Sequence, residues 1–325
     1  MNVDRDPVLD RILSLELARV TERAAIAAAR FAGRGDESQA DNAAIAAMQA
    51  ELDRLPIDGA IVLGEGEPED GGPLRAGAKV GTGGAPVDIA LDPLEGATIC
   101  AKNLPNALAA IAVSRRGSLL SVPDIYMEKI AVGAGYPDGV IDLDASPAEN
   151  IARVADARGV PPERIVACIL DRPRHARLIE AVRSTGAAIR LIGDGDLAAI
   201  MHVADPDRSG VDLYLGSGGS REGILGAALL RCAGGQMQGR LIVDSADKMR
   251  KLAQRGIEDG RRVLTLADMA GGDIIFAATG VTDGPTLGGV KFRGDRIETH
   301  TVVLRSSSGT VRTILSRHRH GERID

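Results

Sequence analysis

Apolar runs that end in acidic, glycine-containing turns recur along this chain and restrict its fold more than any other feature. The strand-like run Asp88–Leu91 leads into Asp92-Pro93-Leu94-Glu95-Gly96, where two carboxylates stand three residues apart. Pro93 sets the turn and Gly96 allows a close backbone approach, so both carboxylates can face one cation. We therefore predict a metal site at this strand end, with the oxygen ligands that suit Mg²⁺ or Mn²⁺.

Acidic clusters elsewhere strengthen that prediction. Asp41 follows GRGDESQA, Glu65 and Glu69 belong to GEGEPED after an apolar strand, and Glu222 follows GSGGSR. A single acidic turn is more often a surface turn, and GEGEPED alone would more often be a solvated loop. Glu222 taken alone is more often a first-turn helix charge. The repeated placement of such clusters favours a ligand role.

Composition limits the size and the partners of the protein. The chain has 325 residues, of which 44% are hydrophobic, and this is enough for two packed domains. A net charge of -6 excludes an overall basic field for nucleic acid or an anionic membrane. With three Tyr, three Phe and no Trp, base-stacking platforms are not expected either.

The cysteines and the hydropathy pattern indicate a cellular compartment. Cys100, Cys168 and Cys232 are odd in number and form no CxxC pair, so we expect reduced, buried thiols and a cytoplasmic protein. We expect neither a membrane span nor a signal peptide, because no apolar run reaches about 18 residues and the N-terminus lacks a basic start before an apolar block.

The first half of the chain is predicted to be mixed α+β. Apolar residues at spacings of three and four predict an amphipathic helix over 7–31, and a second helix is expected over 43–55. Strands are expected at 57–63, 107–113 and 130–132.

The second half is predicted to be α/β. Ser146-Pro147-Ala148-Glu149 is a capping box with proline at the first helical position, and we place the domain boundary there, giving domains 1–148 and 149–325. Strands and helices then alternate, which is typical of a largely parallel sheet. The expected strands are 165–170, 189–192 and 211–215. The expected helices are 147–158, 175–185, a helix that begins at 197, and 222–233. Late strands at 274–278, 301–304 and 310–314 complete this domain.

Polar motifs follow the strands of this second domain. They are Arg172-Pro173-Arg174-His175, Asp194-Gly195-Asp196 and Gly216-Ser217-Gly218-Gly219. Because ligands of such sheets gather at the carboxyl ends of the strands, these groups are predicted to converge on one edge. The glycine motif is not a dinucleotide fingerprint, since its third glycine would fall at Arg221. We assign no histidine to chemistry, and Tyr126 alone could equally be a core residue.

Taken in order, the motifs resemble the class II fructose-1,6-bisphosphatases of the metal-dependent, lithium-sensitive sugar and inositol phosphatase superfamily. The ordered series is highly specific to that class, although no single motif is. The motifs that carry the resemblance are GRGD with Asp41, IVLGEGE, DIALDPLEG, PDIYMEKIAVG, LDRPRH, IGDGD, GSGG with Glu222, ATGVTDG and VVLRSSSGTVR.

The resemblance implies a fold, an activity and partners. The fold would be a layered α-β-α-β-α sandwich. The reaction would be hydrolysis of the 1-phosphate of fructose 1,6-bisphosphate by in-line attack of water with Mn²⁺ or Mg²⁺, and some relatives also accept sedoheptulose 1,7-bisphosphate. A homodimer or homotetramer is expected.

The resemblance also implies the site residues. Arg172 and Arg174 can hold the uncleaved phosphate in two bonds each, Asp194 and Asp196 suit sugar hydroxyls, and the glycines before Glu222 can aim N–H groups at an anion. Metal ligands would be Asp41, Glu65, Asp92, Glu95 and Glu222, with the Leu94 carbonyl as a further donor. Substrate contacts would come from Glu95, Gly96, Ala97, Tyr126, Arg172, Pro173, Arg174, Asp194, Gly195, Asp196 and Gly219. Catalytic positions would be Glu65, Asp92, Glu69 and Ala97.

Three features depart from the family pattern, and one is the segment GGPLR, where the family usually has an APMLY-like run. Ala97 stands where the family has a Thr whose hydroxyl orients the attacking water, and Glu69 stands where the family has Asp. Loss of one positioned hydroxyl lowers turnover by roughly two to three decades at other active sites. We therefore predict a slow or specialised phosphatase. The alternatives are a paralogue that binds metal and sugar phosphate without catalysis, or a phosphatase for another ester, although RPRH and DGD favour a sugar bisphosphate.

Overall fold

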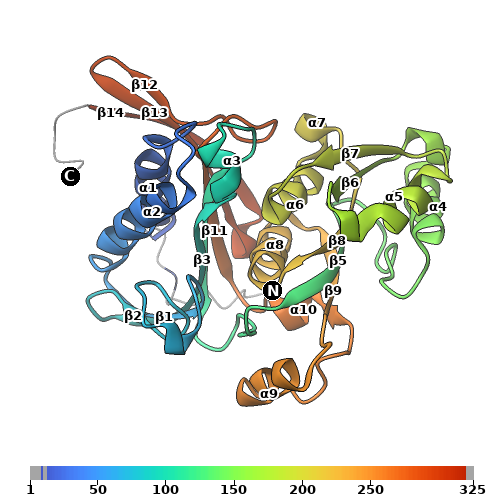
Figure 1. Ribbon diagram of the computed structural model, residues 1–325, viewed down its shortest axis with the longest axis horizontal. Coiled ribbons are helices and arrows are strands. Elements are labelled where there is room, and N and C mark those ends of the chain that lie inside the picture. The colour runs from blue at the N-terminus through green and yellow to red at the C-terminus, as the bar shows by residue number, and fades with distance from the viewer. Residues whose placement is uncertain (1–8, 10–12, 320–325) are drawn as a thin grey trace. The chain divides into compact units, whose positions relative to one another are not determined.

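A computed structural model describes residue 9 and residues 13–319 of the chain (Figure 1). The described residues form two compact units. The first contains residues up to Leu120, then Gly271–Asp283, and the chain from Leu287 onward. The second contains Ser121–Ala270 with the short segment Gly284–Thr286.

The first unit is an eight-stranded sheet with helices. Its strands run in the order β12-β13-β11-β4-β3-β1-β2, and β14 pairs with β13. The elements are α1 (Leu13–Ala29), α2 (Glu37–Leu52), β1 (Ile57–Leu63), the 3-10 turn η1 (Pro68–Asp70), β2 (Lys79–Val80), β3 (Ala85–Glu95), α3 (Ala97–Ala101), β4 (Leu108–Arg115), β11 (Ile274–Gly280), β12 (Lys291–Arg293), β13 (Arg296–Arg305), η4 (Ser306–Ser308) and β14 (Thr310–Arg319).

Helices α1 and α2 pack side by side and contact the strands of this sheet (Figure 1). The apolar stripe of α1, including Leu17 and Val20, is fully buried in one core cluster with Ile89 and Ile111 of the sheet. Asp36 caps α2 by accepting the N–H of Gln39 at 2.9 Å. This cap places the start of α2 six residues before the predicted start, and Asp41 therefore lies in the helix.

The second unit is a six-stranded sheet in the order β10-β9-β5-β8-β6-β7. The capping box at Ser146 begins α4 as predicted. The elements are β5 (Tyr126–Val132), α4 (Pro147–Arg158), η2 (Pro162–Arg164), β6 (Val166–Leu170), η3 (Pro173–His175), α5 (Ala176–Arg183), β7 (Ala188–Ile192), α6 (Asp196–Ala204), α7 (Pro206–Ser209), β8 (Leu213–Gly219), α8 (Ser220–Ala233), β9 (Gln236–Leu241), α9 (Ala246–Gln254), β10 (Leu264–Thr265) and α10 (Leu266–Met269).

Helices cover both faces of this second sheet. Because successive side chains of a strand point to opposite faces, Leu213 and Leu215 pack in a core with Ile151 of α4 and Val182 of α5. Tyr214 points the other way, and its hydroxyl donates to Asp196 of α6 at 2.8 Å. Figure 1 shows α4 and α5 on one side of β6 and β8, with α6 and α8 on the other. The predicted mixed α/β class is confirmed.

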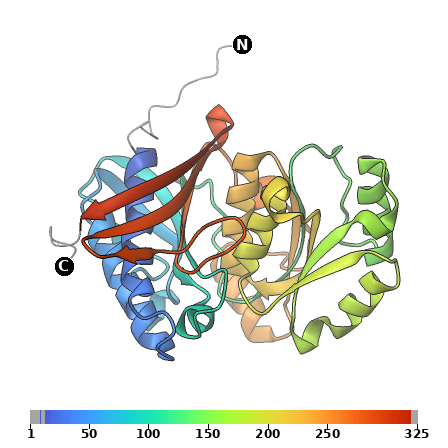
Figure 2. The ribbon, with the colours of Figure 1, turned by 90° about the horizontal axis from the view of Figure 1, so that it is seen from above.

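The structure corrects two predictions about the sheets. The late strands β11, β13 and β14 do not complete the second domain, because β11 pairs with β4 and β13 in the first sheet (Figure 2). The second sheet is also not largely parallel, since only the β6–β7 and β6–β8 pairs are parallel. The compact units divide the chain after Leu120 rather than after residue 148, because β5 pairs with β8 and β9.

The cysteines are free and buried, as expected. Burial raises the pKa of the Cys100 thiol to about 11 and that of Cys168 to about 12, so both are protonated and unreactive at neutral pH. Within the described ranges, none of the helices combines the length and the apolar character that a membrane crossing requires.

His202 of α6 is buried, and neither of its ring nitrogens has a hydrogen-bond partner in the described part of the chain. Burial, together with the smaller effect of the nearby charge of Arg190, lowers the pKa of His202 to about 4. The folded protein therefore carries this histidine uncharged, whereas the unfolded chain takes up its proton near pH 6.5.

This difference predicts that stability falls as pH drops from about 6.5 to about 4. The loss is about 1.4 kcal/mol per pH unit, on the order of 3 kcal/mol in total, because the unfolded state binds the extra proton. His202→Leu should remove this part of the pH dependence. Urea unfolding of the wild-type protein and of His202→Leu, from neutral pH to pH 4, measures this loss of stability. Equal losses in the two proteins would contradict the prediction.

Candidate active site

The acidic turn of the first unit contains a β-bulge in the last residues of β3. Strand β3 continues through Asp92 to Glu95, and its pairing with β4 shifts between these residues, from Asp92 opposite Ala110 to Glu95 opposite Leu108. One extra residue is therefore inserted on β3. Pro93 suits this position because a bulge needs no ladder N–H from it. The prediction that the strand ends before Asp92 is corrected.

The bulge brings the two carboxylates together. One oxygen of Asp92 and one of Glu95 lie within 4.8 Å of each other, and both side chains are buried. Such closely spaced carboxylate oxygens are the donor set of a hard divalent cation. Gly96 follows with a φ of 87°, and a Cβ there would lie 3.0 Å from Ile99, so the turn into α3 requires glycine.

The other acidic residues of this unit lie on neighbouring elements. Asp41 is on α2, which packs against β3 and α3. Glu65 follows β1, the parallel neighbour of β3, and its N–H donates to Leu74 O at 2.9 Å. Glu69 is exposed in η1. Ala97 is the first residue of α3, directly after the bulge.

In the second unit, the predicted motifs converge on one edge of the sheet. Strands β6, β7 and β8 are mutually parallel, so the segments after β6 and β7 and the end of β8 lie at the same edge. Arg172, after β6, forms an ion pair with Asp194, after β7, at 3.0 Å. Both side chains are more than a third exposed and accessible to a ligand.

Arg174 and Tyr126 form a second pair at this edge. The guanidinium carbon of Arg174 lies 5.1 Å from the centre of the Tyr126 ring. Nε and Nη2 of Arg174 donate to Ser217 O at 3.1 and 2.7 Å, which leaves three N–H donors for a ligand. Tyr126 is 49% exposed, so it is not a core residue.

The segment Gly216–Gly219 is part of β8 and is not an open anion-binding loop. It pairs with β5, and Tyr126 stands opposite Gly219. The Ser217 N–H donates to His175 Nε2 at 2.9 Å, so it is not available to an anion. The other ring nitrogen of His175 lies 2.9 Å from Leu170 O, which places the proton on Nδ1. Both ring nitrogens of this buried histidine are therefore held by hydrogen bonds within the second unit.

Asp196 is buried and already holds two partners. The Lys129 ammonium binds its Oδ2, and the Tyr214 hydroxyl donates to its Oδ1 at 2.8 Å. A Cβ on Gly218 would lie 1.8 Å from Oδ2, so only glycine leaves room for this carboxylate. Sequence reasoning missed Lys129 and Tyr214. The available signal was a lysine within the apolar run of PDIYMEKIAVG.

Glu222 lies in the first turn of α8. Its Oε1 is 3.6 Å from Arg221 Nε, while its Oε2 is buried without a hydrogen-bond partner among the residues that the structure describes. A Cβ on Gly219 would lie 1.9 Å from Oε2, so glycine again makes room for a carboxylate. A buried, uncompensated carboxylate oxygen fits a cation ligand.

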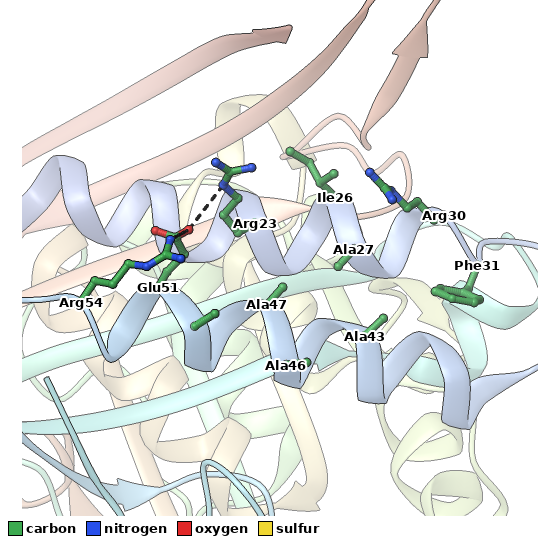
Figure 3. A pocket seen from close by; sticks show the side chains of 11 residues that line it. Arg23, Ile26, Ala27, Arg30, Phe31, Ala43, Ala46, Ala47, Glu51 and Arg54 are labelled. Carbon is green, nitrogen blue, oxygen red and sulfur yellow. Dashed lines mark hydrogen bonds and ion pairs between the residues drawn. The ribbon is translucent and has the colours of Figure 1, made fainter. Parts of the chain in front are cut away.

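A cavity of about 550 Å³ lies elsewhere, between α1 and α2 (Figure 3). Arg23 and Arg54 at its rim both pair with Glu51. None of the predicted site residues lines it. Its lining consists of Arg23, Ile26, Ala27, Arg30, Phe31, Ala43, Ala46, Ala47, Ala50, Glu51 and Arg54.

Comparison with known proteins identifies the family. The family model described as "Bacterial fructose-1,6-bisphosphatase, glpX-encoded" matches residues 11–318. "Fructose-1,6-bisphosphatase 1 class 2" of Escherichia coli (strain K12) is 42% identical over 323 residues, with 95% of each chain covered. The class 2 protein of Shigella flexneri matches at the same identity and coverage.

These matches make the chain a member of a phosphatase family. It belongs to the bacterial fructose-1,6-bisphosphatases of the glpX-encoded, class II type, and the family assignment drawn from the motifs is confirmed. Among solved structures, the extragenic suppressor protein suhB from Bartonella henselae matches with a TM-score of 0.36 and 15% identity over 59% of this chain and 73% of that chain. That likeness is too weak to bear on the fold.

The close approach of Asp196 to Gly218 predicts the effect of one methyl group. Gly218→Ala should destabilise the protein by about 3 kcal/mol, because the new Cβ displaces a buried carboxylate from its ion pair. Gly193→Ala is the control, since nothing lies within 4 Å of its Cβ position. Denaturant unfolding compares the two variants, and equal stability would contradict the prediction.

Proposed function

We propose that this protein hydrolyses the 1-phosphate of fructose 1,6-bisphosphate, giving fructose 6-phosphate and phosphate. The observation that carries the proposal is the match to class 2 fructose-1,6-bisphosphatases along nearly the whole chain. Sedoheptulose 1,7-bisphosphate is a further substrate to test.

The acidic residues are proposed to hold divalent metal. Asp41, Glu65, Asp92, Glu95 and Glu222 supply carboxylate oxygens only, which suits Mg²⁺ or Mn²⁺ better than softer metals. When bound, such ions neutralise charge on the transferred phosphoryl group and the leaving oxygen. The buried Oε2 of Glu222 and the close Asp92 and Glu95 pair support this assignment.

The edge of the second unit is proposed to hold the sugar and the phosphate that is not cleaved. The Arg174 guanidinium lies over the Tyr126 ring and donates twice to Ser217 O, and its other three N–H donors are proposed to bind the phosphate. Arg172 and Asp194 together present a cation and hydroxyl acceptors. The backbone atoms of three residues, Pro173, Gly195 and Gly219, are proposed to contact the sugar and this phosphate. Two residues of the first unit, Glu95 and Gly96, are proposed to contact the 1-phosphate.

The first test is phosphate release from fructose 1,6-bisphosphate by the purified protein with Mn²⁺ or Mg²⁺. We expect release that EDTA abolishes, and a loss of more than a hundredfold in Glu222→Gln, because a neutral amide is a weak ligand. Exposed Glu258→Gln is the matched control. No metal-dependent release by the folded wild-type protein would refute the function and favour a binding paralogue or another phosphate ester.

Ala97 favours the second candidate, a paralogue with weakened catalysis. It is the first residue of α3, beside the carboxylates of the bulge, and its methyl group cannot orient a water molecule. Glu69, at another of the departures, is exposed and one methylene longer than the family residue.

Ala97→Thr is expected to raise kcat by roughly two to three decades by restoring a hydroxyl that positions water. Ala97→Val is the control, because it adds the same branched shape without the hydroxyl, and it should leave kcat low. Steady-state kinetics with fructose 1,6-bisphosphate measures both. If Thr and Val behave alike, the missing hydroxyl does not limit turnover.

A homodimer or homotetramer in the cytoplasm completes the proposal. The family resemblance supports the assembly, and the three free cysteines support a reducing compartment. Sedimentation velocity of the purified protein would test the assembly.

A further inference from the structure

A buried lysine underlies the proposed sugar-binding edge. Lys129 of β5 has no exposed side-chain area, and the Asp196 side chain is 3% exposed. An unpaired ammonium in such a place is costly, so its partners must be fixed. Both oxygens of Asp196 are occupied, one by Lys129 and the other by Tyr214.

The same ammonium reaches a second element. Lys129 Nζ donates to the carbonyl oxygen of Gly219 at 2.8 Å, so one group joins β5, the start of α6 and the end of β8. Gly219 stands opposite Tyr126 and directly precedes α8, which carries Glu222. Asp196 begins α6 two residues after Asp194, the partner of Arg172.

Glycines around this lysine leave the room that it needs. A Cβ on Gly218 would lie 1.8 Å from Asp196 Oδ2 and would collide with it. A Cβ on Gly223 would lie 2.6 Å from Met127 Sδ and 3.3 Å from Lys129 Cδ. Gly218 and the Tyr214 hydroxyl therefore both serve one ion pair that is almost fully buried. An apolar side chain of similar volume would fill a purely structural core position at a lower free-energy cost.

We propose that Lys129 is a positioning residue that, through Asp196 and Gly219, sets the sugar-phosphate contacts made by Asp194, Arg172 and Tyr126. The proposal rests on the function proposed above. Lys129 itself touches no substrate. A shift of about 1 Å in such a support can lower binding or rate on the order of a hundredfold.

The test measures binding of fructose 6-phosphate without metal, by calorimetry, beside KM and kcat for fructose 1,6-bisphosphate. Lys129→Met should raise Kd and KM by about 10- to 100-fold with kcat little changed, because contacts common to ground and transition state are lost. Lys129→Arg keeps the charge and should recover part of the affinity. Lys248→Met is the control, since Lys248 of α9 pairs with Asp244, an exposed residue just before that helix.

Tyr214→Phe covers the case in which Lys129→Met does not fold. It removes only the hydroxyl on Asp196 Oδ1 and should raise Kd several-fold. If Lys129→Met folds and its Kd is unchanged, the proposal is overturned. If Lys129→Met does not fold, an unchanged Kd in Tyr214→Phe overturns it. A fall in unfolding midpoint with unchanged Kd also overturns it, since a merely structural role predicts that result.

The two proposals fail separately. Wild-type protein that binds fructose 6-phosphate but releases no phosphate refutes the hydrolase, while the Kd values of the variants still decide on Lys129. Wild-type protein that hydrolyses fructose 1,6-bisphosphate while the variants keep its Kd refutes only the role of Lys129. Wild-type protein that neither binds nor hydrolyses refutes both.

Discussion

The free-energy cost of removing carboxylates from water governs the arrangement of the site. Moving an ionised carboxylate into the interior costs several kcal/mol unless a cation or hydrogen bonds compensate for it. Asp196 is compensated by Lys129 and Tyr214 within the protein. Asp92 accepts the N–H of Leu94 at 3.2 Å, and Glu222 Oε1 lies 3.6 Å from Arg221 Nε. Divalent metal is the further compensation proposed for Asp92, Glu95 and Glu222. Each of these groups stands beside a glycine or a bulge that makes space for it.

Local backbone irregularity turns ordinary strands into a site. The bulge on β3 puts two carboxylates on one side of a strand that would otherwise alternate its side chains. At the end of β8, Gly218 and Gly219 make room for one carboxylate each, because a Cβ there would collide with Asp196 or Glu222. His175 then fixes the backbone of Ser217 by accepting its N–H. Rigid strands thus carry the side chains that a mobile loop would hold less accurately.

The departures from the family pattern lie beside this framework and not inside it. Ala97 removes a hydroxyl while the bulge, Gly96 and the start of α3 remain. The second unit holds Arg174 over Tyr126 and Lys129 against Asp196. We therefore propose that such a chain keeps its sugar-phosphate contacts and that Ala97 lowers the rate of the chemical step.

The sequence by itself determined the family, most helices and strands, and the residue types of the site, because motifs, capping boxes and apolar periodicity are local. Thus β1, α4 and the segments after β6 and β7 lie where the sequence placed them. Only the tertiary structure decided that β11, β13 and β14 return to the first sheet and that Asp92-Pro93 forms a bulge. It alone revealed the partners of Asp196. Strand pairing and burial join residues far apart in the chain, and no local pattern records those distances.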